Sequence, residues 1–201
     1  MSRIEVNKKI TALLLAAGGS SRLGQPKQLV LFNNEFLINY IVDQIRRGGI
    51  SDIRIVLGSH FSEIKEQIKD KRLEVIRNLY WEEGISSSIK CGLNNLEPET
   101  EAVIIFIVDQ PFLKPELITQ ILQRFSTSKA NIIAACVSGQ IVHPVLYRKE
   151  VFLKLMELKG DIGGKAIFAN EYVETINWKD EKLLLDIDSF DDLEKIKKLI
   201  N

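Results

Sequence analysis

The hydrophobic positions of the chain follow two periods that predict strands alternating with helices. Apolar residues recur every three or four positions in several stretches, the spacing of helices with one buried side, namely 35–47, 61–69, 85–96 and 115–125. Between them lie apolar or alternating runs typical of buried strands, at 10–17, 53–57, 73–77 and 102–108. Strands and helices that alternate along a chain predict a parallel sheet covered by helices on both faces.

The last third of the chain departs from this alternation. Two apolar runs, 131–137 and 141–147, flank a Ser-Gly-Gln turn and predict a hairpin. A strand near 183–188 would place Asp186 and Asp188 on one face, and Ser189 with Asp192 has the spacing of a capping box for a final helix. We expect one domain over residues 1–201, a Rossmann-like three-layer α/β fold with a mostly parallel sheet.

Composition narrows the classes of partner. The 201 residues are 45% hydrophobic, and Lys+Arg 27 against Asp+Glu 27 leaves no net charge that would attract nucleic acid or an anionic membrane. Cys91 and Cys136 are far apart and predict no disulfide framework. Residues 1–9 lack the apolar core of a signal peptide, and no apolar run approaches the roughly 20 residues that span a bilayer. We expect a cytoplasmic protein without nucleic-acid or membrane partners.

The bend after the first strand carries the clearest chemistry. At Gly18, Gly19 and Ser20 the backbone amides can face an anion, because glycine has no Cβ to obstruct the approach. Arg22 and Lys27 follow at positions where long cationic side chains could fold over the same anion. The bend therefore predicts a phosphate cradle, and the ligand we infer is a nucleoside triphosphate.

Two better-known glycine loops do not fit this bend. A dinucleotide fingerprint needs glycine where Ser20 stands, and a P-loop needs lysine directly after its second glycine, where position 25 is Gln. A strand-to-helix turn that uses glycine only for its geometry remains the alternative.

Asp109 is the first candidate metal ligand. It opens an Asp-Gln-Pro sequence directly after the strand 102–108, at the carboxyl edge where open α/β sheets bind ligands. Magnesium takes few protein carboxylates, so one or two aspartates suffice to hold it beside a triphosphate. An aspartate at a strand end can also merely cap a helix, so both interpretations stay open.

A serine-rich segment opens the helix 85–96. Ser86, Ser87 and Ser88 follow Gly84, where they could cap the helix or leave hydroxyls and amides free for a ligand. The residues alone do not separate the two interpretations.

Taken together, Leu15-Ala16-Ala17-Gly18, Ser20, Arg22, Gly24 and Lys27 resemble the signature of the MobA-like NTP transferases. Within that family the pattern resembles the cytidylyltransferase branch that acts on molybdenum cofactor, and five segments from Leu13 to Leu193 follow in the expected order. The resemblance implies a nucleotide-diphospho-sugar transferase-like fold, Mg²⁺ as cofactor, and CTP with a molybdopterin-type cofactor as substrates. A molybdoenzyme or its delivery chaperone is a further partner that it suggests.

The resemblance also assigns roles to residues. Arg22, Lys27 and Asp109 become catalytic, and Asp109 with Asp188 would hold the metal. The residues that it places at the nucleotide are Leu15, Ala16, Ala17, Gly18, Gly19, Ser20, Arg22, Lys27, Gly84, Ser86, Ser87 and Ser88.

The expected acceptor side departs from the family pattern. The resemblance assigns His143, Gly160, Asp161 and Lys165 to the acceptor, but Val replaces the glycine before His143-Pro144, and Gly164-Lys165 replaces Ala-Arg. Lysine offers a point charge where arginine offers a planar fork. From the residues alone, His143 could equally be a structural edge residue and 160–165 an ordinary loop.

The reaction that the resemblance implies is attack by the terminal phosphate of molybdenum cofactor on the α-phosphorus of CTP. Ala17 and the Asp-Gln-Pro sequence resemble the CTP-using branch rather than its guanylyl-transferring relatives. Two other hypotheses remain: a nucleotidyltransferase for a sugar phosphate or another small phosphorylated acceptor, and a nucleotide- or cofactor-binding module without catalysis.

Overall fold

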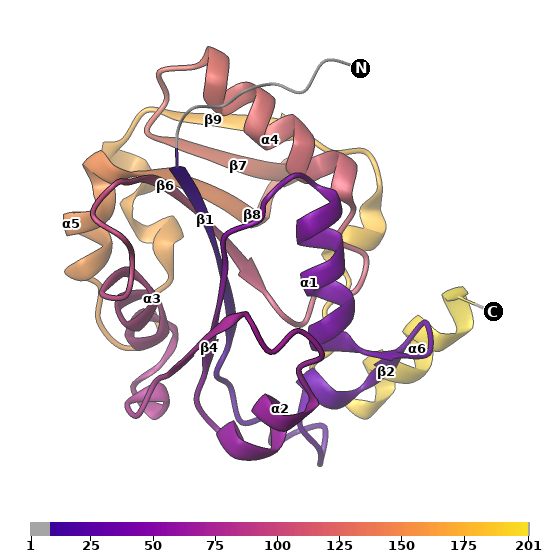
Figure 1. Cartoon of the computed structure of the whole chain (residues 1–201). Coiled ribbons are helices and arrows are strands. Elements are labelled where there is room, and N and C mark those ends of the chain that lie inside the picture. The colour runs from indigo at the N-terminus through magenta and orange to yellow at the C-terminus, as the bar shows by residue number, and fades with distance from the viewer. Residues whose placement is uncertain (1–8, 201) are drawn as a thin grey trace.

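A computed structural model describes residues 9–200. Seven strands form one sheet in the order β5-β4-β1-β6-β8-β7-β9 (Figure 1). Their bounds are β1 Lys9–Ala16, β4 Ile53–Leu57, β5 Glu74–Arg77, β6 Thr100–Ile107, β7 Ile132–Val137, β8 Gln140–Arg148 and β9 Val173–Asn177. A separate ribbon pairs β2 Leu31–Phe32 with β3 Glu35–Phe36. The α-helices are α1 Leu37–Arg47, α2 Phe61–Gln67, α3 Ile85–Leu93, α4 Pro115–Thr127, α5 Phe152–Met156 and α6 Phe190–Ile200.

The sheet is mostly parallel, as predicted. β5, β4, β1 and β6 run parallel, β7 pairs in parallel with β9, and β8 alone of the seven strands runs antiparallel to its neighbours. The predicted hairpin is therefore confirmed, and its second strand is inserted between β6 and β7. Since β8 runs against β6, the start of β8 lies at the same edge as the end of β6.

Helices cover both faces of the sheet, which confirms the three-layer expectation. α1 and α4 lie on one side and α3 and α5 on the other (Figure 1). Each side has its own apolar core: the first also takes up residues of α2 and α6, and the second joins α3 and α5 to the opposite face of the central strands. The continuous apolar runs of β1 and β6 follow from this arrangement, because both of their faces are buried.

One expectation for the C-terminal part was wrong, and one strand there was missed. Residues 183–188 form no strand: a 3-10 helix, Glu181–Leu184, is followed by an extended segment that reaches the helix α6. The strand β9 at Val173–Asn177 was not predicted, because its polar Thr175 and Asn177 lie at exposed positions of an edge strand beside β7. A further 3-10 helix, Gly164–Asn170, precedes β9.

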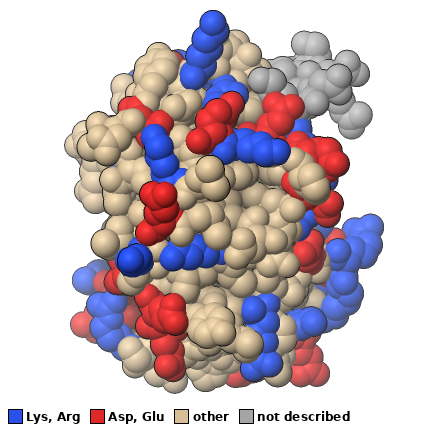
Figure 2. All heavy atoms as spheres, turned by 90° about the vertical axis from the view of Figure 1, so that its left-hand side faces the viewer, with Lys and Arg blue, Asp and Glu red and all other residues tan. Residues whose placement is uncertain are grey.

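The face that carries α3 and α5 is seen in Figure 2, where basic and acidic side chains are interspersed. This distribution agrees with the balanced composition, and it means that an anion at this face meets local rather than long-range attraction. Among residues 9–200, no helix combines the length and the apolar character that a bilayer crossing requires.

Candidate functional site

The phosphate bend and Asp109 leave neighbouring strands at one edge of the sheet. β1 pairs in parallel with β6 so that Leu15 lies opposite Ile107, and the Val108 amide donates to the Leu15 carbonyl at 3.2 Å. The bend begins at Gly18, three residues after Leu15, and Asp109 stands two residues after Ile107. The sheet therefore brings together two groups that are about 90 residues apart in sequence, as the rule for parallel strands predicts.

The bend is held from within by a residue that the sequence did not single out. Gln28 is buried, and its side-chain Nε2 donates to the Ala16 carbonyl at 2.6 Å and to the Gly18 carbonyl at 3.3 Å. The Ser20 hydroxyl accepts from the Lys27 amide at 3.0 Å, which closes the bend from the other side. Because these contacts engage carbonyls of the strand end and the bend, they hold the bend on the sheet edge beside Asp109.

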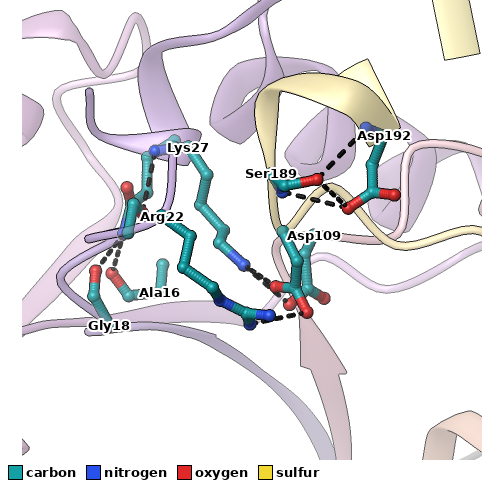
Figure 3. Close-up of polar contacts among 10 residues, drawn as sticks. Ala16, Gly18, Arg22, Lys27, Asp109, Ser189 and Asp192 are labelled. Carbon is teal, nitrogen blue, oxygen red and sulfur yellow. Dashed lines mark hydrogen bonds and ion pairs between the residues drawn. The ribbon is translucent and has the colours of Figure 1, made fainter. Parts of the chain in front are cut away.

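Lys27 links the bend to both predicted metal ligands. Its Nζ lies 2.6 Å from Asp188 Oδ1 and 3.2 Å from Asp109 Oδ2, and the Lys27 side chain is only 12% exposed. Arg22 reaches the same cluster from the bend, with a guanidinium nitrogen 3.2 Å from Asp188 Oδ2. Figure 3 shows the Arg22 and Lys27 side chains running side by side toward Asp109. Two cations and two carboxylates thus converge on one point.

Asp188 arrives by a route other than the predicted strand. The Ile187 amide donates to the Asp109 carbonyl at 2.9 Å, which fixes the extended segment beside the loop after β6. Just beyond, the capping box forms as predicted: the Ser189 amide donates to Asp192 Oδ2 at 3.0 Å and the Asp192 amide donates to the Ser189 hydroxyl at 3.3 Å (Figure 3). The start of α6 therefore anchors Asp188 at the site.

The charges of this cluster stabilise one another against burial. Burial opposes the charge of Lys27, but Asp109 and Asp188 together raise its pKa above the usual value. The hydrogen bond from Lys27 lowers the pKa of Asp188, while burial raises that of Asp109 against the attraction of Lys27. The cluster is arranged so that a positive charge between the two carboxylates is strongly favoured.

Asp186 is a third acid near the centre that the sequence reasoning assigned to no role. Desolvation of its carboxyl group, followed by repulsion from Asp109, raises its pKa to about 7. Its alternation with Asp188 was a visible signal, although the shared face was expected from a strand that is not there. Among residues 9–200, no group of three or more acids, histidines and cysteines is arranged as a metal cluster. A metal site here would rest on paired carboxylates.

The serine segment lies in the first turn of α3, and its hydroxyls are largely engaged. Asn78 donates to the hydroxyls of Ser87 at 2.9 Å and Ser88 at 3.1 Å, and Ser87 donates to the Gly84 carbonyl at 2.8 Å. The residue that precedes α3 is Gly84, which makes no side-chain capping bond, so Ser87 braces the first turn through its hydroxyl without capping the helix. Ser86 and Ser87 also line a cavity of about 570 Å³ on the outer side of α3, away from the charged cluster.

Trp81 connects the serine segment to the bend. A side chain added at Gly19 would meet the Trp81 ring at 3.2 Å, and one at Gly58 would meet the Trp81 Cβ at 2.4 Å. The half-buried indole therefore requires glycine at position 58, while at Gly19 it leaves only tight space for a side chain.

Gly84 lies so close to the loop 160–165 that position 84 has no room for a side chain. Its φ is +97°, and an added Cβ would lie 2.6 Å from the Gly160 carbonyl. The Ser86 amide donates to the same carbonyl at 3.3 Å, and the Ile85 amide donates to Asp161 Oδ1 at 3.4 Å. Gly160 and Asp161, predicted at the acceptor, therefore also cap the helix that carries the serine segment.

A second cavity of about 400 Å³ opens directly beside the charged cluster. The predicted acceptor residues His143, Asp161 and Lys165 line it together with Asp109 and Asp186. Gly160 does not belong to its lining but to that of the outer cavity. Glycine replaces the family's alanine at position 164 for a steric reason, because a Cβ there would lie 2.3 Å from the buried Tyr147 hydroxyl.

The cations of a glycine bend and the acids of two other segments meet at one edge of a mostly parallel sheet, an arrangement that suits a nucleotidyltransferase type of domain. The model of the MobA-like NTP transferase domain matches residues 12–176. The chain belongs to this family.

Relatives of known name agree with this assignment. Bifunctional protein GlmU of Clostridium botulinum (strain Eklund 17B / Type B) is 29% identical over 179 residues, which are 86% of this chain and 39% of that protein. The chain thus spans about two fifths of the length of this curated relative.

Solved structures share the whole fold. A homolog of Rv0371c from Mycobacterium sp. strain JC1 superposes with a TM-score of 0.82 and 28% identity, covering 95% of this chain and 96% of that one. Rv0371C of Mycobacterium tuberculosis H37Rv in complex with manganese gives a TM-score of 0.78 with 21% identity, covering 95% and 98%.

Proposed function

We propose that this chain transfers a cytidylyl group from CTP to the terminal phosphate of a molybdopterin-type cofactor and releases pyrophosphate. The observation that carries the proposal is the convergence of Lys27 and Arg22 with Asp109 and Asp188 at the sheet edge. Cations that lie on a phosphate-binding bend and carboxylates that suit a divalent ion are the two requirements of nucleotidyl transfer.

A divalent cation fits between Asp109 and Asp188. The two carboxylates already share one positive group, Lys27 Nζ, and carboxylate oxygen is the donor that magnesium prefers. When bound, such an ion would neutralise charge on the triphosphate and on the departing pyrophosphate. A protein of this fold crystallised with manganese, so Mn²⁺ belongs in the assay beside Mg²⁺.

Lys27 and Arg22 have two sets of partners in this proposal. They pair with the carboxylates in the structure. With nucleotide bound, they would instead donate hydrogen bonds to the phosphate oxygens. The amides of Gly18, Gly19 and Ser20 would hold the remaining phosphate oxygens, with Gln28 keeping the bend in place.

The acceptor would enter through the cavity beside Asp109. Its nucleophile is a phosphate that is already ionised at neutral pH, so the reaction needs no general base. Catalysis then consists of positioning the two substrates and compensating the charge that develops at the transferred phosphorus.

Cytosine as the base rests on the resemblance of Ala17 and the Asp-Gln-Pro sequence to the CTP-using branch, and molybdopterin as the acceptor rests on the wider pattern from Leu15 to Lys27. The cytoplasmic location is the expectation drawn above from cysteine usage and hydropathy. The test measures pyrophosphate release by the purified protein with Mg²⁺ or Mn²⁺, molybdopterin-bound molybdenum cofactor, and CTP, GTP, ATP or UTP in turn. We expect release with CTP that requires both cofactor and metal.

Other outcomes distinguish the other hypotheses. Release only when a sugar phosphate replaces the cofactor would identify a different nucleotidyltransferase, and tight binding of CTP without release would identify a binding module. Asp109→Asn should abolish release, whereas Asp191→Asn, an exposed acid at the start of α6, serves as the matched control.

A further inference from the structure

His143 occupies a bulge at the start of β8, next to the reacting edge. Its neighbours Val142 and Val145 pair with consecutive residues of β7, Ala135 and Ala134, so His143 and Pro144 are two extra residues in the ladder. A bulge of this kind turns a side chain away from the regular alternation of the strand. The half-buried His143 ring lines the cavity that also contains Asp109.

The hydrogen bonding of His143 defines which ring nitrogen carries the proton. Nδ1 lies 3.2 Å from the Ile105 carbonyl oxygen, which can only accept, so Nδ1 must donate. Burial lowers the pKa of His143 to about 4, and the ring is therefore neutral at physiological pH. Nε2 is then left with a free lone pair, and within residues 9–200 it has no hydrogen-bond partner.

The rest of the cavity is also rich in hydrogen-bond acceptors. Three carboxylates, those of Asp109, Asp161 and Asp186, line it, and Lys165 is the one basic residue among its described lining. Lys165 Nζ donates to the Ile141 carbonyl at 2.5 Å, which directs part of its hydrogen-bonding capacity to the protein backbone. A second phosphate or carboxylate entering this space would meet more negative charge than positive.

We propose that His143 determines acceptor specificity by receiving, at Nε2, a hydrogen bond from an N–H or O–H group of the acceptor. This inference rests on the proposed function, in which the cavity receives the acceptor. The part of the acceptor beyond its reacting phosphate is accordingly an uncharged, donor-rich group. The amino and ring N–H groups of a pterin have this chemistry, and so do the hydroxyls of a sugar.

The tautomer is tested directly by nitrogen NMR on the intact protein. The chain contains two histidines, so His60→Gln leaves His143 as the single imidazole, and His60 lies in the loop before α2, outside the site. We expect one protonated nitrogen, Nδ1, and one unprotonated nitrogen, Nε2, from pH 8 down to about 5.5. An Nε2-protonated ring would overturn the inference.

Ligand titrations then separate the two donor chemistries. Free pterin and free glucose are added to the labelled protein as probes. We expect the Nε2 resonance to move toward the hydrogen-bonded range with one of them. If neither compound moves it, the inference is wrong whether or not the protein is a transferase.

Two variants complete the test in the transferase assay. His143→Asn keeps a donor near the Nδ1 position but loses the acceptor at Nε2, while His143→Gln can place its carbonyl oxygen near Nε2. We expect about a tenfold rise in the acceptor KM for His143→Asn, partial recovery for His143→Gln, and an unchanged KM for CTP. Equal acceptor KM values for wild type and His143→Asn would overturn the role of His143 and leave the proposed function standing. Absence of turnover by the wild type would instead contradict the proposed function.

Discussion

Replacing Lys27 by Met tests the central arrangement, because methionine keeps most of the chain length and removes the charge. Lys27 Nζ stands between Asp109 and Asp188, where the proposed function places a divalent cation. On that proposal, Lys27 and the metal compete for the same carboxylates until a triphosphate gives the lysine another partner. The variant should lose turnover and, without nucleotide, bind metal more tightly.

The structure supplies the magnitudes. A contact of about 3 Å between unit charges corresponds to roughly 5 kcal/mol at an effective dielectric constant near 20. Solvent screens much of this at Asp188, whose side chain is 41% exposed. We therefore expect a gain of about 1.5 kcal/mol in metal binding, or roughly tenfold. Removing a charge that stabilises the transition state should lower kcat by about 10² to 10³.

Calorimetric titration with Mn²⁺ in the absence of nucleotide measures the first effect, and pyrophosphate release at saturating CTP measures the second. Lys129→Met is the matched control, since Lys129 is an exposed residue beyond α4 and outside the site. Near wild-type turnover in Lys27→Met would refute the charge role. Unchanged or weaker Mn²⁺ binding would refute the competition between lysine and metal.

Three further predictions concern the supports of the site. Gly84→Ala should destabilise the protein by about 2 kcal/mol more than Gly139→Ala in urea unfolding. Both glycines have positive φ, but only at Gly84 would the added Cβ lie 2.6 Å from a backbone carbonyl. Equal losses of stability would contradict the steric argument. Gln28→Ala should raise the KM for the nucleotide and lower the free energy of unfolding by about 1–3 kcal/mol, because the Ala16 and Gly18 carbonyls lose their hydrogen-bond donor. An unchanged KM would show that the bend keeps its conformation without Gln28. The third prediction is a pH dependence: because the folded pKa of His143 is about 4 and the unfolded value is 6.5, the unfolded chain binds the proton first, and the free energy of unfolding should fall by up to about 3 kcal/mol as the pH drops from 7 to 4. The same pH titration of His143→Gln, which shares all neighbouring acids and Lys165, should lack that part of the decrease.

The residues expected at the centre of the site were predictable because the sequence rules act locally. An apolar run followed by glycines specifies a buried strand and a bend, and an apolar run that ends in Asp109 specifies a carboxylate at the sheet edge. Parallel neighbouring strands then bring these two features together without further information. Asp188 was predicted as a metal ligand through the family resemblance. In the structure it lies beside Asp109, next to the capping box of Ser189 and Asp192, whose spacing is visible in the sequence.

Other features depended on contacts between segments far apart in the chain. Gln28 looked like an ordinary polar residue after Lys27, and only its burial under the bend reveals the clamp on Ala16 and Gly18. Asn78 was equally inconspicuous before folding brought it to the serine hydroxyls. No local pattern marks such residues, because their hydrogen-bond partners are fixed by packing.

The sequence by itself determined the layered α/β fold, the glycine bend and the charged residues that follow it, since periodicity and glycine placement constrain the backbone directly. The tertiary structure alone decided that Lys27 lies between the two aspartates, that β8 enters the sheet antiparallel, and that the Nδ1 of His143 binds the Ile105 carbonyl. These depend on distances between side chains and backbone atoms that no spacing along the chain specifies. Charge and tautomer at the site follow from those distances and from burial.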